Sequence, residues 1–335
     1  MEEMHFIIRH GKPSAGCNPC LRVVFETIRN KEGKMDRLLQ DEERITKILK
    51  ISVMVIAAAE ILVGIISIIY GDHLFFIAES IWAFGVIMLM VFHGLPLLGW
   101  KNMGVIMLIG FFGSLLFEGL GINFGVVFSQ YTYNDLIPGP KIFGFNVYAM
   151  AGYAVAIYII WATVQAAIGM TGNHLKKSDV ILMPILCSIV ITSVDFATDL
   201  LLATIKGAYD WWDEGVYYGI PFGNYRGWYI MGFFLFLAIA VFLYRQGQKG
   251  RIPETPKVAR RKWFWAAPPL LYACIWLPLP LFMLIPDSYE VTTYAGQSFM
   301  TGDIYQGIAI VCTGAILGPA LLAAVRVFRS EELTA

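Results

Sequence analysis

Eight apolar runs of about 20 residues constrain the fold of this chain more than any other feature. A helix needs about 20 such residues to cross the hydrocarbon core of a bilayer. Charged residues make up only 15% of the 335 residues, against about 25% in soluble domains. The sequence therefore predicts an all-α, polytopic membrane helix bundle with spans near 46–70, 74–93, 103–123, 147–169, 180–204, 228–244, 264–285 and 304–326. Four prolines in the seventh span should kink or break it.

The distribution of basic residues predicts the orientation of these spans. With eight spans, every Lys and Arg except Lys141, Lys206 and Arg226 falls on one side or at the adjoining helix ends. Basic residues are enriched on the cytoplasmic side of membrane proteins. We therefore expect a multi-pass protein of the cell membrane with both termini inside. Residues 1–45 form a cytoplasmic extension, and residues 46–330 form the transmembrane helical domain that carries any catalytic site.

Five carboxylic acids lie within the predicted spans, where no Lys, Arg or His lies deep enough to neutralise them. A charge at the centre of a bilayer costs about 3 kcal/mol or more, so such residues usually face an internal cavity and have a function. The predicted topology places all five in the outer halves of their helices. We expect them to line one cavity on the extracytoplasmic side: Glu60, Glu79, Glu118, Asp195 and Asp199.

The fifth span carries a polar stripe. Ser188, Thr192, Asp195 and Asp199 are spaced by four, three and four residues, which places them on one face of a helix. Two neighbouring carboxylates in an apolar environment oppose each other's ionisation, so at least one is expected to keep its proton and to act as an acid. The alternative is a structural stripe that hydrogen-bonds other helices.

Two predicted outer segments, 118–148 and 207–229, are rich in aromatic residues. The second has nine aromatic residues in 23 positions, together with several glycines and Pro221, which predicts a folded loop. An interfacial aromatic belt is the simpler explanation for such residues. Aromatic faces beside carboxylic acids also suit a long apolar polyene and a carbocation, which the ring quadrupoles stabilise.

Several function classes lack their signatures. The five histidines form no metal-binding cluster, and neither a dinucleotide-binding glycine motif nor a phosphate-binding loop is present. The lone pair Cys17 and Cys20 has no second pair with which to hold a metal. The sequence predicts no metal and no cofactor, and with a net charge of zero nothing in it predicts a nucleic-acid partner.

Two motifs resemble the carotenoid biosynthesis membrane proteins, a family that includes bacterial carotenoid 1,2-hydratases and haloarchaeal bisanhydrobacterioruberin hydratase. The resemblance covers about residues 50–325, and the tryptophan-rich loop is its most specific part. The first motif comprises Glu118, Gly121, Tyr131, Tyr133, Gly139, Pro140, Lys141 and Gly144. The second comprises Asp195, Asp199, Trp211, Trp212, Gly215, Tyr217, Tyr218, Gly219, Ile220, Pro221, Asn224, Gly227 and Trp228.

The resemblance implies addition of water to the C1–C2 double bond at the open end of a linear carotenoid or another long isoprenoid. Asp195 or Asp199 is the expected acid, and Glu118 is expected to orient the water. The resemblance also implies that other membrane enzymes of carotenoid biosynthesis are candidate partners. Substrate binding is expected at Trp211, Trp212, Tyr217, Tyr218, Tyr131, Tyr133, Asn224 and Trp228.

Three alternatives remain open from the sequence. A carotenoid cyclase would use the same protonation but exclude water. A magnesium-dependent prenyltransferase would use the aspartates at 195, 199, 210 and 213, although basic residues for a diphosphate are scarce beside them. A proton-coupled transporter would also need buried carboxyl groups, but its usual inverted repeat is not seen.

Overall fold

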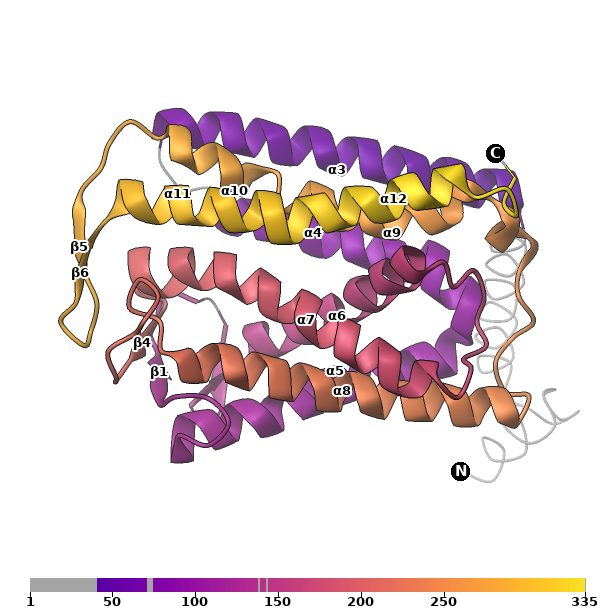
Figure 1. Ribbon diagram of the computed structural model, residues 1–335, viewed down its shortest axis with the longest axis horizontal. Helices are drawn as coiled ribbons and strands as arrows, with labels where there is room; N and C mark the ends of the chain where they lie inside the picture. Colours follow the sequence, from indigo (N-terminus) through magenta and orange to yellow (C-terminus); the bar gives the residue numbers. More distant parts are fainter. Residues whose placement is uncertain (1–40, 71–74, 138, 143, 335) are drawn as a thin grey trace, which may run out of the picture.

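Long helices run side by side along one axis in the computed structural model of the chain (Figure 1). The structure describes residues 41–334 except 71–74, 138 and 143. Nearly all of the predicted extension, with Cys17 and Cys20, lies outside these residues. The main helices are α3 (Glu42–Tyr70), α4 (Phe75–Leu89), α5 (Leu95–Phe124), α6 (Val147–Ile168), α7 (Asp179–Asp199), α8 (Phe222–Gln248), α9 (Lys262–Ile275), α11 (Thr301–Val311) and α12 (Gly318–Arg329).

Short elements complete the described fold. Three π-helical turns continue longer helices: η2 (Met90–Gly94), η3 (Leu200–Ile205) and η6 (Cys312–Leu317). The other turns are η4 (Lys257–Arg260), α10 (Pro278–Leu281) and η5 (Phe282–Leu284). Three two-stranded antiparallel ribbons pair β1 (Tyr131–Tyr133) with β4 (Tyr209–Trp211), β2 (Lys141–Ile142) with β3 (Phe145–Asn146), and β5 (Glu290–Thr292) with β6 (Ser298–Met300).

Within the described residues, seven helical stretches are long and apolar enough to cross a membrane. They are Glu42–Tyr70, Ser80–Phe124, Val147–Ile168, Asp179–Ile205, Phe222–Gln248, Lys262–Leu284 and Thr301–Arg329. This confirms the predicted class, a polytopic helical membrane protein. The number differs from the predicted eight because the second and third predicted spans belong to one stretch of 45 residues.

That long stretch is longer than one crossing requires. A straight helix of this length would extend about 68 Å, whereas the hydrocarbon core is about 30 Å thick. Gly99 interrupts it with φ 75° and ψ 156°, a conformation that favours glycine. Trp82, before this bend, and Glu118, after it, line the same cavity, so the chain folds back at Gly99.

The two ends of the described chain lie together. Arg261 Nε is 3.6 Å from Glu42 Oε2 at the start of α3. The neighbouring Lys262 backbone N–H donates to the carbonyl of Thr334 at 2.8 Å. Both ends of the described chain therefore lie at the same end of the bundle. The ribbons formed by β1–β4 and β5–β6 lie at the opposite end (Figure 1).

The predicted break in the seventh span occurs after Ile275. Pro268 and Pro269 lie inside α9, and Pro278 begins the short α10. The sixth span begins earlier than predicted, at Phe222 instead of 228, so part of the aromatic loop is the first turns of α8. The chain before α8 is held against the other predicted loop by the β1–β4 ribbon.

Candidate active site

The β1–β4 ribbon brings the two aromatic segments together. Tyr131 is paired with Trp211 and Tyr133 with Tyr209, while Thr132 lies opposite Asp210. Side chains alternate between the two faces of a strand. One face of the ribbon therefore carries three tyrosines and a tryptophan, and these four rings lie 4.7 to 5.9 Å apart between neighbouring centroids.

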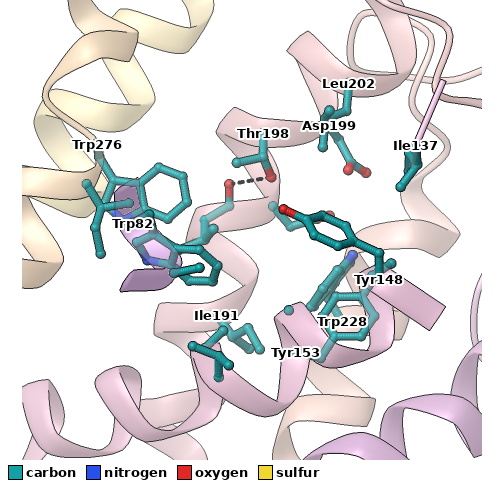
Figure 2. A pocket seen from close by; sticks show the side chains of 18 of the residues that line it. Trp82, Ile137, Tyr148, Tyr153, Ile191, Thr198, Asp199, Leu202, Trp228 and Trp276 are labelled. Carbon is teal, nitrogen blue, oxygen red and sulfur yellow. Dashed lines mark hydrogen bonds between the residues drawn. The ribbon is translucent and has the colours of Figure 1, made fainter. Parts of the chain in front are cut away.

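A cavity of about 410 Å³ lies directly beneath this face of the ribbon. Its floor and walls come from α4 to α9, and most of its lining is aliphatic or aromatic. In the view of Figure 2, Trp82 and Trp276 lie on one side of the pocket and Tyr153 and Trp228 on the other. Among the described residues that line it, none is Lys, Arg or His.

Three of the five predicted acids meet in this cavity. Glu118 comes from α5, and Asp195 and Asp199 come from α7; all three are at most 4% exposed. Glu60 is also buried, but it lies outside the lining, and neither of its side-chain oxygens has a partner among the described residues. The side chain of Glu79 is outside what the structure describes.

One amide connects the two aspartates. The Asn224 Nδ2 group donates to Asp195 Oδ2 and to Asp199 Oδ2, each at 2.6 Å. An amide nitrogen has two hydrogens, so both bonds can form at once. Asn224 lies in the first turn of α8, where α8 packs against α7. This contact fixes the relative positions of the two carboxyl groups.

A second donor reaches Asp199 but not Asp195. The Tyr209 hydroxyl donates to Asp199 Oδ1. The π-helical turn η3 ends α7 directly after Asp199 and leads into β4, which places Tyr209 above this carboxyl group. Burial raises the pKa of Tyr209 well above its usual value, so the phenol stays protonated and remains a donor.

Glu118 is held by two other phenols. The Tyr153 hydroxyl donates to Oε1 at 2.8 Å, and the Tyr133 hydroxyl donates to Oε2 at 3.4 Å. Burial also raises the pKa of Tyr133 well above its usual value. The start of α6, which carries Tyr153, is fixed by Asn146, whose side chain accepts from the backbone N–H groups of Tyr148 and Ala149.

The hydroxyls of the polar stripe on α7 do not join this network. Ser188 donates to the carbonyl of Ile185 at 2.8 Å, and Thr192 donates to the carbonyl of Ser188 at 2.7 Å. Both hydroxyl groups donate to backbone carbonyls of their own helix, as such side chains often do in apolar helices. Gly232 of α8 packs directly against this part of α7, at Ser188 and Ile191.

The predicted binding residues divide into two groups. Tyr131, Tyr133, Trp211, Asn224 and Trp228 line the cavity. Trp212, Tyr217 and Tyr218 do not. Trp212 is half exposed and donates to Thr132 Oγ1 at 3.1 Å.

The two remaining predicted residues lie in a tight turn beyond β4. Tyr217 packs against Phe196 and Tyr225. The Tyr218 hydroxyl donates to the carbonyl of Asp303 on α11 at 3.2 Å. These side chains anchor the turn to neighbouring helices and lie outside the cavity.

Nine further lining residues with polar or aromatic side chains were not among the predicted site residues. They are Trp82, Phe128, Tyr148, Tyr153, Thr198, Tyr209, Tyr272, Trp276 and Phe282. Their roles depend on packing between distant segments. A signal was present only for Tyr209: tyrosine at 209 and tryptophan at 211 repeat the alternation of the tyrosines at 131 and 133, which is typical of paired strands.

The alternation of side chains along β4 separates Asp210 from Asp195 and Asp199, although the prenyltransferase alternative would use these aspartates together. Asp195 and Asp199 line the cavity, whereas Asp210 alternates with its lining neighbours Tyr209 and Trp211 and is absent from that lining. No cluster of three or more His, Cys, Asp or Glu side chains with the spacing for a metal ion occurs in the part of the chain that the structure describes.

The fold and this site define a polytopic membrane protein with three carboxylic acids inside an apolar, aromatic-rich cavity. The carotenoid biosynthesis protein family model matches residues 77–296, and the chain belongs to this family. Every described residue that lines the cavity falls within the matched range. Membership places the chain in carotenoid biosynthesis. No curated protein and no solved structure matches the chain.

Proposed function

We propose that this protein adds water to the C1–C2 double bond at the acyclic end of a linear carotenoid. The observation that carries the proposal is the meeting of three carboxyl groups in one apolar cavity of a carotenoid biosynthesis protein. Hydration of an isolated double bond needs a strong proton donor, an environment that tolerates a carbocation, and a positioned water. Each requirement has a candidate group in the cavity.

Asp195 is the proton donor in this mechanism. Asp199 accepts hydrogen bonds at both oxygens, from Tyr209 and Asn224, whereas Asn224 is the one donor to Asp195 among the described residues. Hydrogen bonds donated to a carboxyl group favour its ionised form. The pair therefore keeps its proton on Asp195, which delivers it to C2 of the substrate and leaves a tertiary cation at C1.

Glu118 is the group that orients and deprotonates the water. Its two phenol donors favour the carboxylate and fix its plane. The water oxygen bonds to C1 as Glu118 takes the released proton. Return of a proton from Glu118 to Asp195 completes the cycle, so the net reaction is addition of one water with no redox change.

The rings of the cavity stabilise the cation between these two steps. Trp228 and Tyr153 lie next to each other, with ring centroids 5.2 Å apart, and the Tyr153 hydroxyl is bonded to Glu118. A cation within about 6 Å of an aromatic face gains about 2 kcal/mol or more where water is excluded. The rest of the cavity lining is aliphatic, which suits the methyl groups of the substrate that take no part in the reaction.

The cavity is proposed to lie on the extracytoplasmic side of the membrane. It is covered by the β1–β4 ribbon, which is at the opposite end of the bundle from the start of α3 and the C-terminus (Figure 1). The segment 245–262, with seven basic residues, leads to Arg261 at that other end. Basic loops are retained in the cytoplasm.

The test is incubation of the purified protein with acyclic carotenoids in deuterated water. The proposal expects a tertiary alcohol that carries deuterium at C2. A cyclic product with deuterium at C2 would identify a cyclase, which shares the protonation step. A requirement for magnesium and a diphosphate substrate would identify a prenyltransferase, and flux of the unchanged compound would identify a transporter.

A further inference from the structure

The described residues that line the cavity are mostly buried, and their few exposed members are confined to two helices. Ile87 of α4 is 50% exposed and Tyr148 of α6 is 41% exposed. Ala151 of α6 is also exposed. Lining residues from α5, α7, α8 and α9 are all buried or half-buried. The cavity therefore reaches the surface of the protein between α4 and α6.

The protein surface around this opening is apolar. Ile87 lies one turn beyond Phe84, which is 60% exposed on the same apolar helix. Neither helix has a charged residue in the part that borders the opening, apart from Glu79, whose side chain is not described. An aqueous channel would have polar rims, whereas these rims are aliphatic and aromatic.

The two helices are held together by buried contacts at the ends that lie away from the ribbons. The His93 ring nitrogen Nδ1 and the Tyr158 hydroxyl form a buried hydrogen bond of 2.7 Å between η2 and α6. At Gly94, a Cβ atom would lie only 2.8 Å from the ring of Tyr158. Toward the ribbons, by contrast, no described atom lies within 4 Å of the Cβ position at Gly152.

We infer that the gap between α4 and α6 is a lateral portal through which one end of a linear polyene enters from the bilayer. This inference rests on the proposed function and names how its substrate is presented. A cavity of about 410 Å³ is at the lower end of pockets that enclose a whole drug-sized ligand. It accommodates an end group, while the rest of a long, lipid-dissolved chain extends through the portal into the hydrocarbon.

The portal should also set the choice of substrate. A linear chain passes between two helices, whereas a ring at the same end of the molecule is wider than an extended polyene. The small side chains of Ala149, Ala151, Gly152 and Ala156 border the opening along α6. Acyclic ends should therefore enter and cyclised ends should not.

The test is a bulky side chain at the portal. Gly152→Phe places a ring in open space, so it should leave the packing intact. Gly104→Phe is the matched control, because Gly104 is exposed, has no described atom near its Cβ position, and lies outside the cavity lining. Uptake of a linear carotenoid into detergent-solubilised protein is followed by quenching of tryptophan fluorescence, and hydration is followed by product analysis.

If the gap is the portal, we expect uptake of the linear carotenoid to be at least tenfold slower in Gly152→Phe. Gly104→Phe should take it up at the wild-type rate. A short acyclic isoprenoid with the same end group should be affected less than threefold. Ala151→Trp should repeat the result if Gly152→Phe folds poorly. Wild-type uptake by both portal variants would overturn the portal. Uptake without hydration by the wild-type protein would overturn the proposed reaction and leave the portal standing, and no uptake at all would overturn both.

Discussion

Buried carboxyl groups occur in two different environments in this protein. Asp195, Asp199 and Glu118 line a cavity, and each accepts hydrogen bonds from an amide or a phenol. Glu60 of α3 is completely buried, has no described partner at either oxygen, and lies outside the cavity lining. Burial alone therefore does not place a carboxyl group in the cavity or give it hydrogen-bond donors. The donors around a carboxyl group, and the space in front of it, decide what it can do.

The largest effect should follow removal of the proposed acid. Asp195→Asn keeps the size of the side chain and can still bond Asn224, but it has no acidic proton. Product formation should fall about 1000-fold, within the range that general acids contribute. Measurement of kcat with an acyclic carotenoid tests this. Activity within tenfold of the wild type would remove Asp195 from the mechanism.

Loss of the water-orienting carboxylate should have the next largest effect. Glu118→Gln should reduce kcat about 100-fold with little change in KM, because water addition is slowed while the apolar contacts to the substrate remain. A fraction of the cation should then lose a proton or close a ring. Unchanged kcat with a raised KM would show that Glu118 only binds substrate.

Removal of the phenol above Asp199 should have a smaller effect. Tyr209→Phe removes one donor to the carboxylate, and hydrogen bonds to charged groups contribute about 1.5–3 kcal/mol. We expect activity to fall about tenfold, with the ring packing retained. Tyr229→Phe, on an exposed face of α8, is the control. Equal activities of the two variants would show that Tyr209 does not tune the aspartate pair.

The two neighbouring tryptophans provide a finer comparison. Trp211 lines the cavity, whereas Trp212 points away and is half exposed. Trp211→Phe should raise KM about threefold to fivefold, since one wall of the pocket changes shape, as judged from the expected loss of about 1 kcal/mol of ring contacts. Trp212→Phe should change KM less than twofold. The reverse order would place the substrate on the outer face of the ribbon.

The smallest effect on activity is expected at Glu60. Glu60→Gln removes the ionisable group from a buried site without altering its size, and no hydrogen bond to a described residue is lost with it. Hydration should remain within about twofold of the wild type, and the midpoint of thermal unfolding in detergent should not decrease. A loss comparable to that of Asp195→Asn would abolish the distinction between the two environments.

The sequence was sufficient to predict the class of fold and the helix that carries the acids. Span length and the bias of basic residues depend on the membrane as a solvent, so they can be read without tertiary structure. The helical spacing likewise predicts that Asp195 and Asp199 share a face. The sequence predicts separate spans at 74–93 and 103–123, whereas the structure has one helical stretch that is interrupted by a bend at Gly99.

The partners of the acids could not be predicted in the same way. Tyr153 is one tyrosine in an apolar span, and its contact with Glu118 exists only because α6 packs beside α5. Tyr209 reaches Asp199 because of the register between β1 and β4. The same register turns Trp212 outward, and the turn beyond it anchors Tyr217 and Tyr218 elsewhere. Packing between distant segments decides these details.

The location of the shared proton is the most direct test of this account. Infrared difference spectroscopy can compare the carbonyl stretch of protonated carboxyl groups in the wild-type protein, Asp195→Asn and Glu60→Gln, each in ordinary and deuterated water. The account predicts a protonated-carboxyl band that persists in Glu60→Gln, shifts on deuteration and disappears in Asp195→Asn. An unaltered set of bands in Asp195→Asn would mean that this aspartate carries no proton to give.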